Sequence, residues 1–94
     1  MNRNNADDIS EISALLSKLK QDDDIKSLFR DIFTKKELET LSKRWQILKL
    51  LSEGRTQREI AEKLHVSLCK VTRGAKILKN KQSVITKHMI KEKL

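Results

Sequence analysis

The chain has 94 residues, with no proline, two glycines and one cysteine, and its formal net charge is +8 at pH 7. We predict a single domain over residues 1–94. A domain this small leaves apolar surface that it cannot bury alone, which favours a homodimer. Abundant Leu, Ile, Lys and Glu, with no proline and few β-branched runs, favour helices over a sheet and predict an all-α fold. One cysteine excludes an internal disulfide and a cysteine-based zinc site.

Positive charge increases toward the C-terminus. Residues 1–24 carry three basic and six acidic side chains, residues 25–54 seven and four, and residues 55–94 eleven and three. Such a basic region is typical of proteins that bind polyanions, because neutralised phosphates release condensed counterions. A merely solvated basic surface has the same composition. Charge alone therefore leaves both interpretations open.

The sequence does not support a membrane protein, a secreted protein or an enzyme. No apolar run approaches the roughly 20 residues that span a bilayer, and Met1 to Asp8 lack a hydrophobic signal core, so we expect a cytoplasmic protein. No catalytic triad, paired carboxylates, glycine-rich phosphate loop or metal-ligand cluster is present. The two histidines, His65 and His88, are isolated in the sequence. We expect no enzyme, no metal and no bound cofactor.

Two amphipathic helices are predicted before residue 34. The first covers roughly residues 8–20, capped by Asp7 or Asp8, and its apolar residues recur at helical spacing: Ile9, Ile12, Leu15, Leu16 and Leu19. The acidic run at 22–24 suits the N-terminal end of a second helix dipole. The apolar side of that second helix consists of Ile25, Leu28, Phe29, Ile32 and Phe33. Each apolar stripe needs a partner surface.

A third and a last helix follow from capping signals. Thr34 and Glu37 form a capping box that starts the third helix, and Gly54 offers a left-handed cap at its end. Its apolar residues are Leu38, Leu41, Trp45, Ile47, Leu48, Leu50 and Leu51. Because Trp45 continues this stripe, we place it in the core or a dimer interface rather than in a ligand cage. Ser83 opens the last helix, whose predicted apolar side consists of Val84, Ile85, Met89 and Ile90.

The segment from about residue 56 to 79 predicts a helix-turn-helix, two short helices joined by a tight turn. Thr56 with Glu59 is a second capping box, and Ser67 caps the second helix. The shared core is predicted from Ile60, Ala61, Leu64, Val66, Val71, Ala75 and Leu78. His65 occupies the turn position that glycine usually takes, where positive φ carries little strain only without a Cβ.

This motif predicts binding to double-stranded DNA. Its second helix would enter a major groove by its N-terminal end, where base edges and phosphates are met. The supporting helix opens with Gln57 and Arg58, which would reach the DNA backbone, or Arg58 a guanine. The expected DNA-contact residues are Gln57, Arg58, Ser67, Leu68, Cys69, Lys70, Thr72 and Lys79. A purely structural helical hairpin is the alternative.

The tracts TQREIAEKLHVS and KVTRGAKILK, and LFRDIFTKKELETLSKRWQILKLLSEG before them, resemble the Trp repressor family. The resemblance implies a homodimer in which two six-helix subunits are intertwined. It also implies repression of tryptophan-related genes, with L-tryptophan as co-repressor held between two arginines. Arg44 in SKRW and Arg73 in TRG match these arginines. The ligand-binding residues implied are Thr34, Arg44, Arg73, Gly74 and Ile77, with Gly74 leaving room for the ligand.

The chain departs from the family pattern near the implied ligand. Ile77 stands where the best-known members carry serine, and it cannot donate a hydrogen bond. Asp31 and Phe33 replace aliphatic positions, Lys70 replaces a small polar residue, and one residue fewer follows the third helix. Without the resemblance, the simpler interpretation is that Arg44 is a surface charge and that Arg73 contacts a phosphate. The alternatives are a related regulator that is ligand-independent or senses another small molecule, and a basic helical adaptor that binds RNA or an acidic protein.

Overall fold

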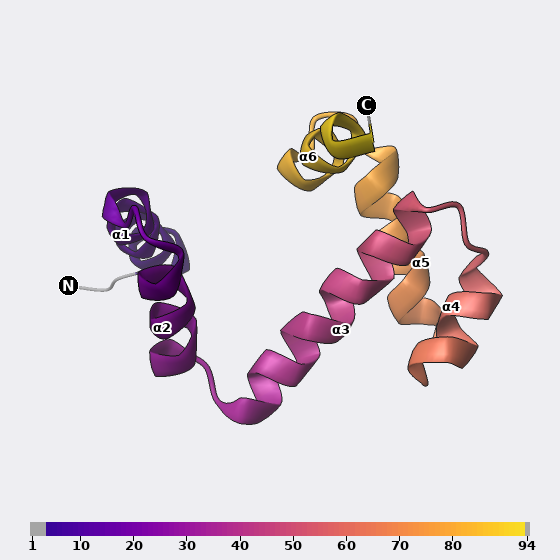
Figure 1. The fold of residues 1–94 in the computed structure, drawn as a ribbon, viewed down its shortest axis with the longest axis horizontal. Coiled ribbons are helices and arrows are strands. Elements are labelled where there is room, and N and C mark those ends of the chain that lie inside the picture. Colours follow the sequence, from indigo (N-terminus) through magenta and orange to yellow (C-terminus); the bar gives the residue numbers. More distant parts are fainter. Residues whose placement is uncertain (1–3, 94) are drawn as a thin grey trace. The chain divides into compact units, whose positions relative to one another are not determined.

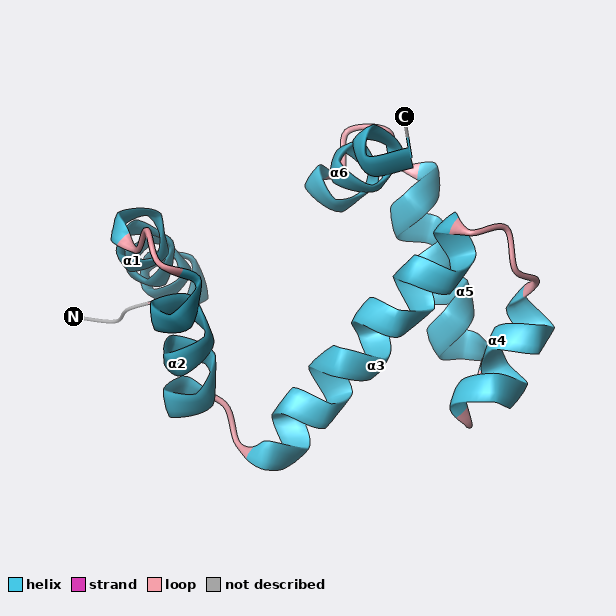
Figure 2. Ribbon diagram, in the orientation of Figure 1, coloured by secondary structure: helices cyan, strands magenta, loops and turns pink. Residues whose placement is uncertain are grey.

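The computed structural model describes residues 4–93, which form six helices and no strand within that range. They are α1 (Asn5–Lys18), α2 (Asp22–Ile32), α3 (Lys35–Ser52), α4 (Gln57–Leu64), α5 (Leu68–Lys79) and α6 (Val84–Lys93) (Figures 1 and 2). The prediction of an all-α, six-helix chain is confirmed. The chain divides into two compact units, one up to Leu38 and one from Glu39 onward, so that α3 begins in the first and ends in the second.

α1 begins earlier than predicted, because Asn4 is its N-cap in place of Asp7 or Asp8. Asn4 Oδ1 accepts a hydrogen bond from the Asp7 amide at 3.1 Å, and the Asp7 carboxylate accepts one from the Asn4 amide at 3.5 Å. These two bonds form a capping box, which satisfies two donors that the first turn leaves without partners. Asp7 thus serves as the second half of the cap.

The apolar residues of α1 and α2 are not buried in the single chain. Neither helix contains a buried side chain, and Ile9, Leu15 and Ile32 are 62%, 48% and 53% exposed. The Phe29 and Phe33 rings pack edge to face at 5.8 Å between centroids. The stripe residues that reach half-burial are Leu16, Leu19, Ile25, Leu28, Phe29 and Phe33. The predicted apolar stripes are therefore incompletely covered inside this unit.

Both ends of α3 follow the predicted signals. Glu37 donates its amide to Thr34 Oγ1 at 3.1 Å, and the Glu37 carboxylate accepts from the Thr34 amide at 2.8 Å, so the capping box is confirmed. At the other end Gly54 has φ +89, and the Arg55 amide donates to the Leu50 carbonyl at 3.2 Å. This is the hydrogen-bond pattern of a Schellman motif, which favours glycine at the left-handed position.

The core of the C-terminal unit is formed by α3, α4 and α5. Its buried members are Ile47, Ile60, Leu64 and Val71, with Leu50, Leu51, Ala61 and Val66 packed against them. Gly74 of α5 is also buried. A Cβ at this position would lie 2.9 Å from Ile47 Cγ2 and 3.3 Å from Leu51 Cδ1. Such separations are shorter than van der Waals contact, so any side chain at position 74 would have to displace Ile47 and Leu51.

α6 is held to α5 by a buried hydroxyl group. Thr86 is 2% exposed, and its Oγ1 donates to the Ile77 carbonyl at 2.7 Å. The Ile77 carbonyl also accepts from the Asn80 amide at 3.1 Å, so Thr86 adds a second hydrogen bond to an oxygen that has two lone pairs. The Thr86 amide in turn donates to Ser83 Oγ at 3.3 Å, which confirms Ser83 as the residue that opens this helix.

The apolar side predicted for α6 is partly wrong. Val84 is 82% exposed, whereas Met89 is buried together with Thr86. The hydrogen bond of Thr86 to the end of α5 explains the difference, because it turns a polar residue inward and leaves the first position of the helix outside. The side chain of Ile90 lies outside the described residues.

Candidate nucleic-acid interface

α4 and α5 are the two helices predicted between residues 56 and 79 (Figure 1). Thr56 Oγ1 accepts from the Glu59 amide at 3.1 Å, and Ser67 Oγ accepts from the Lys70 amide at 3.3 Å. Both residues are therefore N-caps, as predicted. The Glu59 carboxylate lies 3.9 Å from Arg55 Nη1, in an exposed ion pair. Of the predicted capping box, the hydrogen bond from the Glu59 amide to the Thr56 hydroxyl is the one that fixes the start of α4.

The turn between the helices places a non-glycine residue in the left-handed region. His65 has φ 55 and ψ 47, and the Val66 amide donates to the Ala61 carbonyl at 3.1 Å. This bond closes the end of α4 and redirects the chain into Ser67. The prediction that His65 replaces the usual glycine is confirmed. Its Cβ costs roughly 1 kcal/mol in this conformation.

Replacing His65 with glycine is expected to raise the free energy of unfolding by about 0.5–1 kcal/mol, because the left-handed strain disappears. The greater conformational freedom of glycine in the unfolded chain offsets part of this gain. Urea denaturation followed by circular dichroism, at matched protein concentration, measures the change. His65→Asn is the control, because asparagine tolerates positive φ and keeps a Cβ; it should lie between the two. A less stable glycine variant would show that the imidazole makes a compensating interaction.

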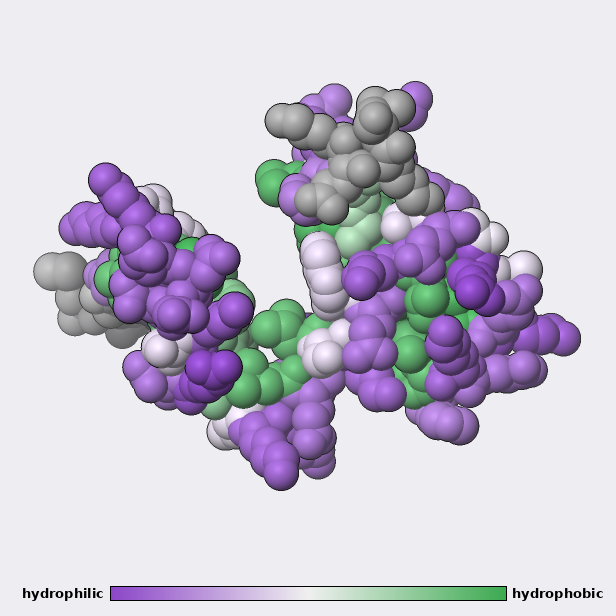
Figure 3. Space-filling view, viewed as in Figure 1, coloured by the Kyte–Doolittle hydropathy of each residue, from purple (hydrophilic) through white to green (hydrophobic). Residues whose placement is uncertain are grey.

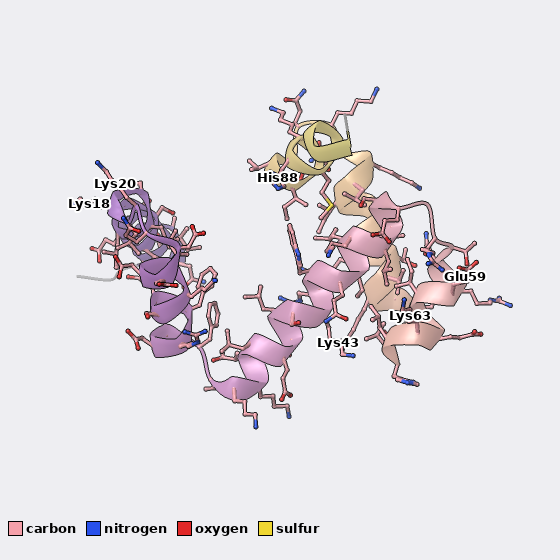
Figure 4. All side chains as sticks on the ribbon, viewed as in Figure 1. Lys18, Lys20, Lys43, Glu59, Lys63 and His88 are labelled. Atoms are coloured by element: carbon pink, nitrogen blue, oxygen red, sulfur yellow. The ribbon has the colours of Figure 1, made fainter. Side chains whose placement is uncertain are left out.

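Lys43 of α3 fixes the C-terminal end of α4. Figure 4 labels Lys43 on α3. The Lys43 Nζ donates to the Leu64 carbonyl at 3.0 Å. A cation at this end satisfies a carbonyl without a helical partner and interacts favourably with the helix dipole. Helical spacing did not reveal this residue, because the two partners are 21 positions apart. Lys43 therefore connects the motif to the long helix beneath it.

The cap and the first two turns of α5 present the predicted contact residues to solvent. Those exposed at or after its cap are Ser67, Leu68, Cys69, Lys70 and Thr72. Leu68 is 48% exposed although it is large and apolar. Arg58 and Lys79 are exposed as well, and Gln57 is half-buried. Every charged side chain of α5 is cationic: Lys70, Arg73, Lys76 and Lys79.

Thr72 makes hydrogen bonds within the protein. Its Oγ1 lies 2.9 Å from Gln57 Oε1 and 3.0 Å from the Leu68 carbonyl oxygen. The bond to Gln57 joins the start of α4 to the middle of α5. Two residues predicted to contact DNA are therefore brought together, and part of their hydrogen-bonding capacity is used between them.

The arginines implied for a ligand pocket lie on the two helices that cross at Gly74. Arg73 directly precedes Gly74 on α5, and Arg44 lies one turn before the buried Leu48 on α3; both arginines are exposed. Ile77 follows one turn after Gly74 and is half-buried. The close packing of Gly74 on α3 favours glycine at this position for structural reasons, independently of any contribution to ligand binding.

Thr34 belongs to the N-terminal unit, where its hydroxyl accepts the Glu37 amide as the N-cap of α3. In the C-terminal unit an open depression of about 410 Å³ lies beside α4. Its lining residues are Leu50, Arg55, Glu59, Ile60, Glu62 and Lys63. None of the residues implied for a tryptophan pocket lines it.

Metal and membrane sites are absent from the part of the chain that the structure describes. Over residues 4–93 no group of three or more His, Cys, Asp or Glu side chains is placed to hold a metal ion. Within the same range no helix combines the length and apolar character needed to cross a bilayer. Cys69 is an exposed free thiol.

The packed pair α4 and α5, with both N-caps and a tight turn, defines a helix-turn-helix protein. A family model described as "Trp repressor protein" matches residues 7–93. The chain therefore belongs to the Trp repressor family, whose members are transcriptional repressors and not enzymes. This confirms the resemblance found in the sequence.

Curated relatives carry the same family name. A "Trp operon repressor homolog" of Xylella fastidiosa is 44% identical over 62 residues, which cover 65% of this chain and 67% of the relative. A homolog of Chlamydia trachomatis is 35% identical over 79 residues, covering 83% and 84%. One from Chlamydia caviae is 41% identical over 66 residues, covering 69% and 65%. No solved structure gives a significant match.

Proposed function

We propose that the chain is a cytoplasmic homodimer that binds double-stranded operator DNA through α5 and represses tryptophan-related genes. The observation that supports this best is the first turn of α5. Leu68, Cys69 and Lys70 are exposed there, while Val71 is fully buried against the other helices. A rigidly anchored helix with a free N-terminal turn suits entry into a major groove. The wholly cationic charge of α5 supplies attraction to phosphate.

Replacing Lys70 or Arg58 with alanine is expected to weaken operator binding by about 1–3 kcal/mol if the side chain reads a base. The measurement is a fluorescence-anisotropy titration with near-palindromic duplexes, selected from a random pool, at two salt concentrations. Lys87→Ala on α6 removes an equal exposed charge outside the motif and should leave affinity nearly unchanged. Unchanged binding by both motif variants would contradict this docking of α5.

The homodimer is proposed from apolar surface that the single chain leaves uncovered. On α3, Leu41 and Trp45 are 39% and 44% exposed, and Figure 3 shows hydrophobic residues at the surface in the region of this helix. Trp45 is thus outside the core of one chain. Of the two positions predicted for it, the dimer interface is the one that we propose. Exposed apolar patches of this kind mark partner surfaces, and a second copy also relieves the small size of the chain. Light scattering that gives a monomer mass would contradict the homodimer.

L-Tryptophan is the proposed co-repressor. Arg44 and Arg73 flank the crossing of α3 and α5, and guanidinium groups both stack on aromatic rings and bind carboxylates. Adding millimolar L-tryptophan to the same titrations tests this part separately. Salt-sensitive, tryptophan-indifferent binding would retain the DNA-binding role and favour a ligand-independent regulator or another ligand. Preference for structured RNA over duplex DNA would favour the adaptor.

A further inference from the structure

We infer that Thr72 is a positioning residue for DNA binding: its hydroxyl orients the Gln57 carboxamide so that the amide NH2 group of Gln57 donates to a DNA phosphate. This inference rests on the proposed DNA binding through α5. It assigns the two residues different tasks, although the sequence predicted both as direct contacts.

The contact between Thr72 and Gln57 connects separate elements. Gln57 is the first residue of α4, directly after the Thr56 cap, and Thr72 lies in the second turn of α5, 15 positions later. The oxygen-to-oxygen distance of 2.9 Å is that of a hydrogen bond in which the hydroxyl donates to the carboxamide oxygen. Gln57 is half-buried, so part of the residue packs against the motif and part of it is accessible to solvent.

Proton counting decides which group faces DNA. A threonine hydroxyl has one proton, whereas a glutamine carboxamide has one acceptor oxygen and two N–H donors. When Thr72 donates to Gln57 Oε1, both N–H groups of Gln57 remain available outside the contact. Phosphate oxygens accept hydrogen bonds and do not donate them. A neighbouring phosphate therefore favours the orientation in which Gln57 Oε1 points to Thr72.

To contact a phosphate directly, Thr72 would have to donate its single hydroxyl proton to that phosphate. The hydroxyl already lies within hydrogen-bond distance of Gln57 Oε1 and of the Leu68 carbonyl oxygen, and both of these are acceptors. Donation to phosphate would withdraw the proton from both. The structure thus favours an indirect role for Thr72, and the two roles differ in how Thr72 and Gln57 depend on each other.

A double-mutant cycle tests this dependence. Thr72→Val keeps the branched shape without the hydroxyl, and Gln57→Ala removes the carboxamide. Operator affinity is measured by anisotropy for the wild type, both single variants and the double variant, with urea denaturation to verify folding. We expect each single variant to bind about fivefold to tenfold more weakly, as for one lost hydrogen bond. The double variant should bind as Gln57→Ala does, because Thr72 acts only through Gln57.

Thr72→Ser is the matched control, since it restores the hydroxyl and should recover wild-type affinity. If Thr72→Val weakens the Gln57→Ala protein by the same factor as the wild type, Thr72 contacts DNA itself and the inference is wrong. It is also wrong if Thr72→Val or Gln57→Ala binds as the wild type does, or if serine fails to restore affinity. A wild-type protein that binds no duplex overturns the proposed DNA binding first, so the two failures are distinguishable.

Discussion

Replacing Gly74 with valine is expected to lower the free energy of unfolding by about 3 kcal/mol, because overpacking at a tight helix crossing forces both helices apart. A Cβ at this position would lie 2.9 Å from Ile47 Cγ2 and 3.3 Å from Leu51 Cδ1. The Ile47 methyl belongs to a β-branched side chain with restricted χ1 rotation, so it has little freedom to move aside. Valine adds two further methyl groups in the same space.

Urea denaturation followed by circular dichroism measures this loss. Lys76→Val is the matched control, since it introduces the same residue on an exposed site of the same helix and should change stability by less than about 1 kcal/mol. Gly74→Ala should fall between them, because the overpacking of one methyl is partly offset by the better helix propensity of alanine. Equal stability of Gly74→Val and Lys76→Val would contradict the close crossing of α3 and α5.

The features that could be predicted from the sequence are those set by residues within a few positions of each other. The N-caps Thr34, Thr56 and Ser67 and the left-handed cap at Gly54 all depend on bonds of this short range. Helical periodicity likewise predicted the buried residues Ile60, Leu64 and Val71. Ala75 and Leu78, which were also predicted, are only half-buried. The cap of α1 was placed wrongly because Asn and Asp are both good cap residues, so residue type alone cannot choose among neighbours.

Contacts between distant segments could not be predicted in this way. Lys43 to Leu64, Gln57 to Thr72 and Ile77 to Thr86 span 21, 15 and 9 positions. Each depends on how helices pack, which the period of one helix does not contain. The same holds for the candidate ligand site, because nothing in spacing relates Arg44 to Arg73 across the α3–α5 crossing. That relation came from the resemblance to a known family.

L-Tryptophan is expected to tighten operator binding by the wild-type protein and to have no such effect on Arg44→Leu. Arg44 is exposed on α3, outside the core and outside the helix-turn-helix segment. Its loss should therefore remove stacking on the indole ring or binding of the carboxylate without changing affinity for DNA in the absence of tryptophan. Arg73 is a poorer probe because it lies on the reading helix itself. Anisotropy titrations with and without millimolar tryptophan measure the response.

Lys49→Leu is the control for this prediction, because it removes one exposed positive charge from the same helix and should keep the tryptophan response. Ile77→Ser then tests the departure from the family pattern. A hydroxyl there can serve a polar ligand group that isoleucine leaves unpaired, a difference of about 1–3 kcal/mol, so serine should increase tryptophan affinity. A wild-type protein without response, combined with a responsive Ile77→Ser variant, would locate the loss of sensing at this position. A response by Arg44→Leu equal to that of the wild type would exclude the arginine pair as the ligand clamp.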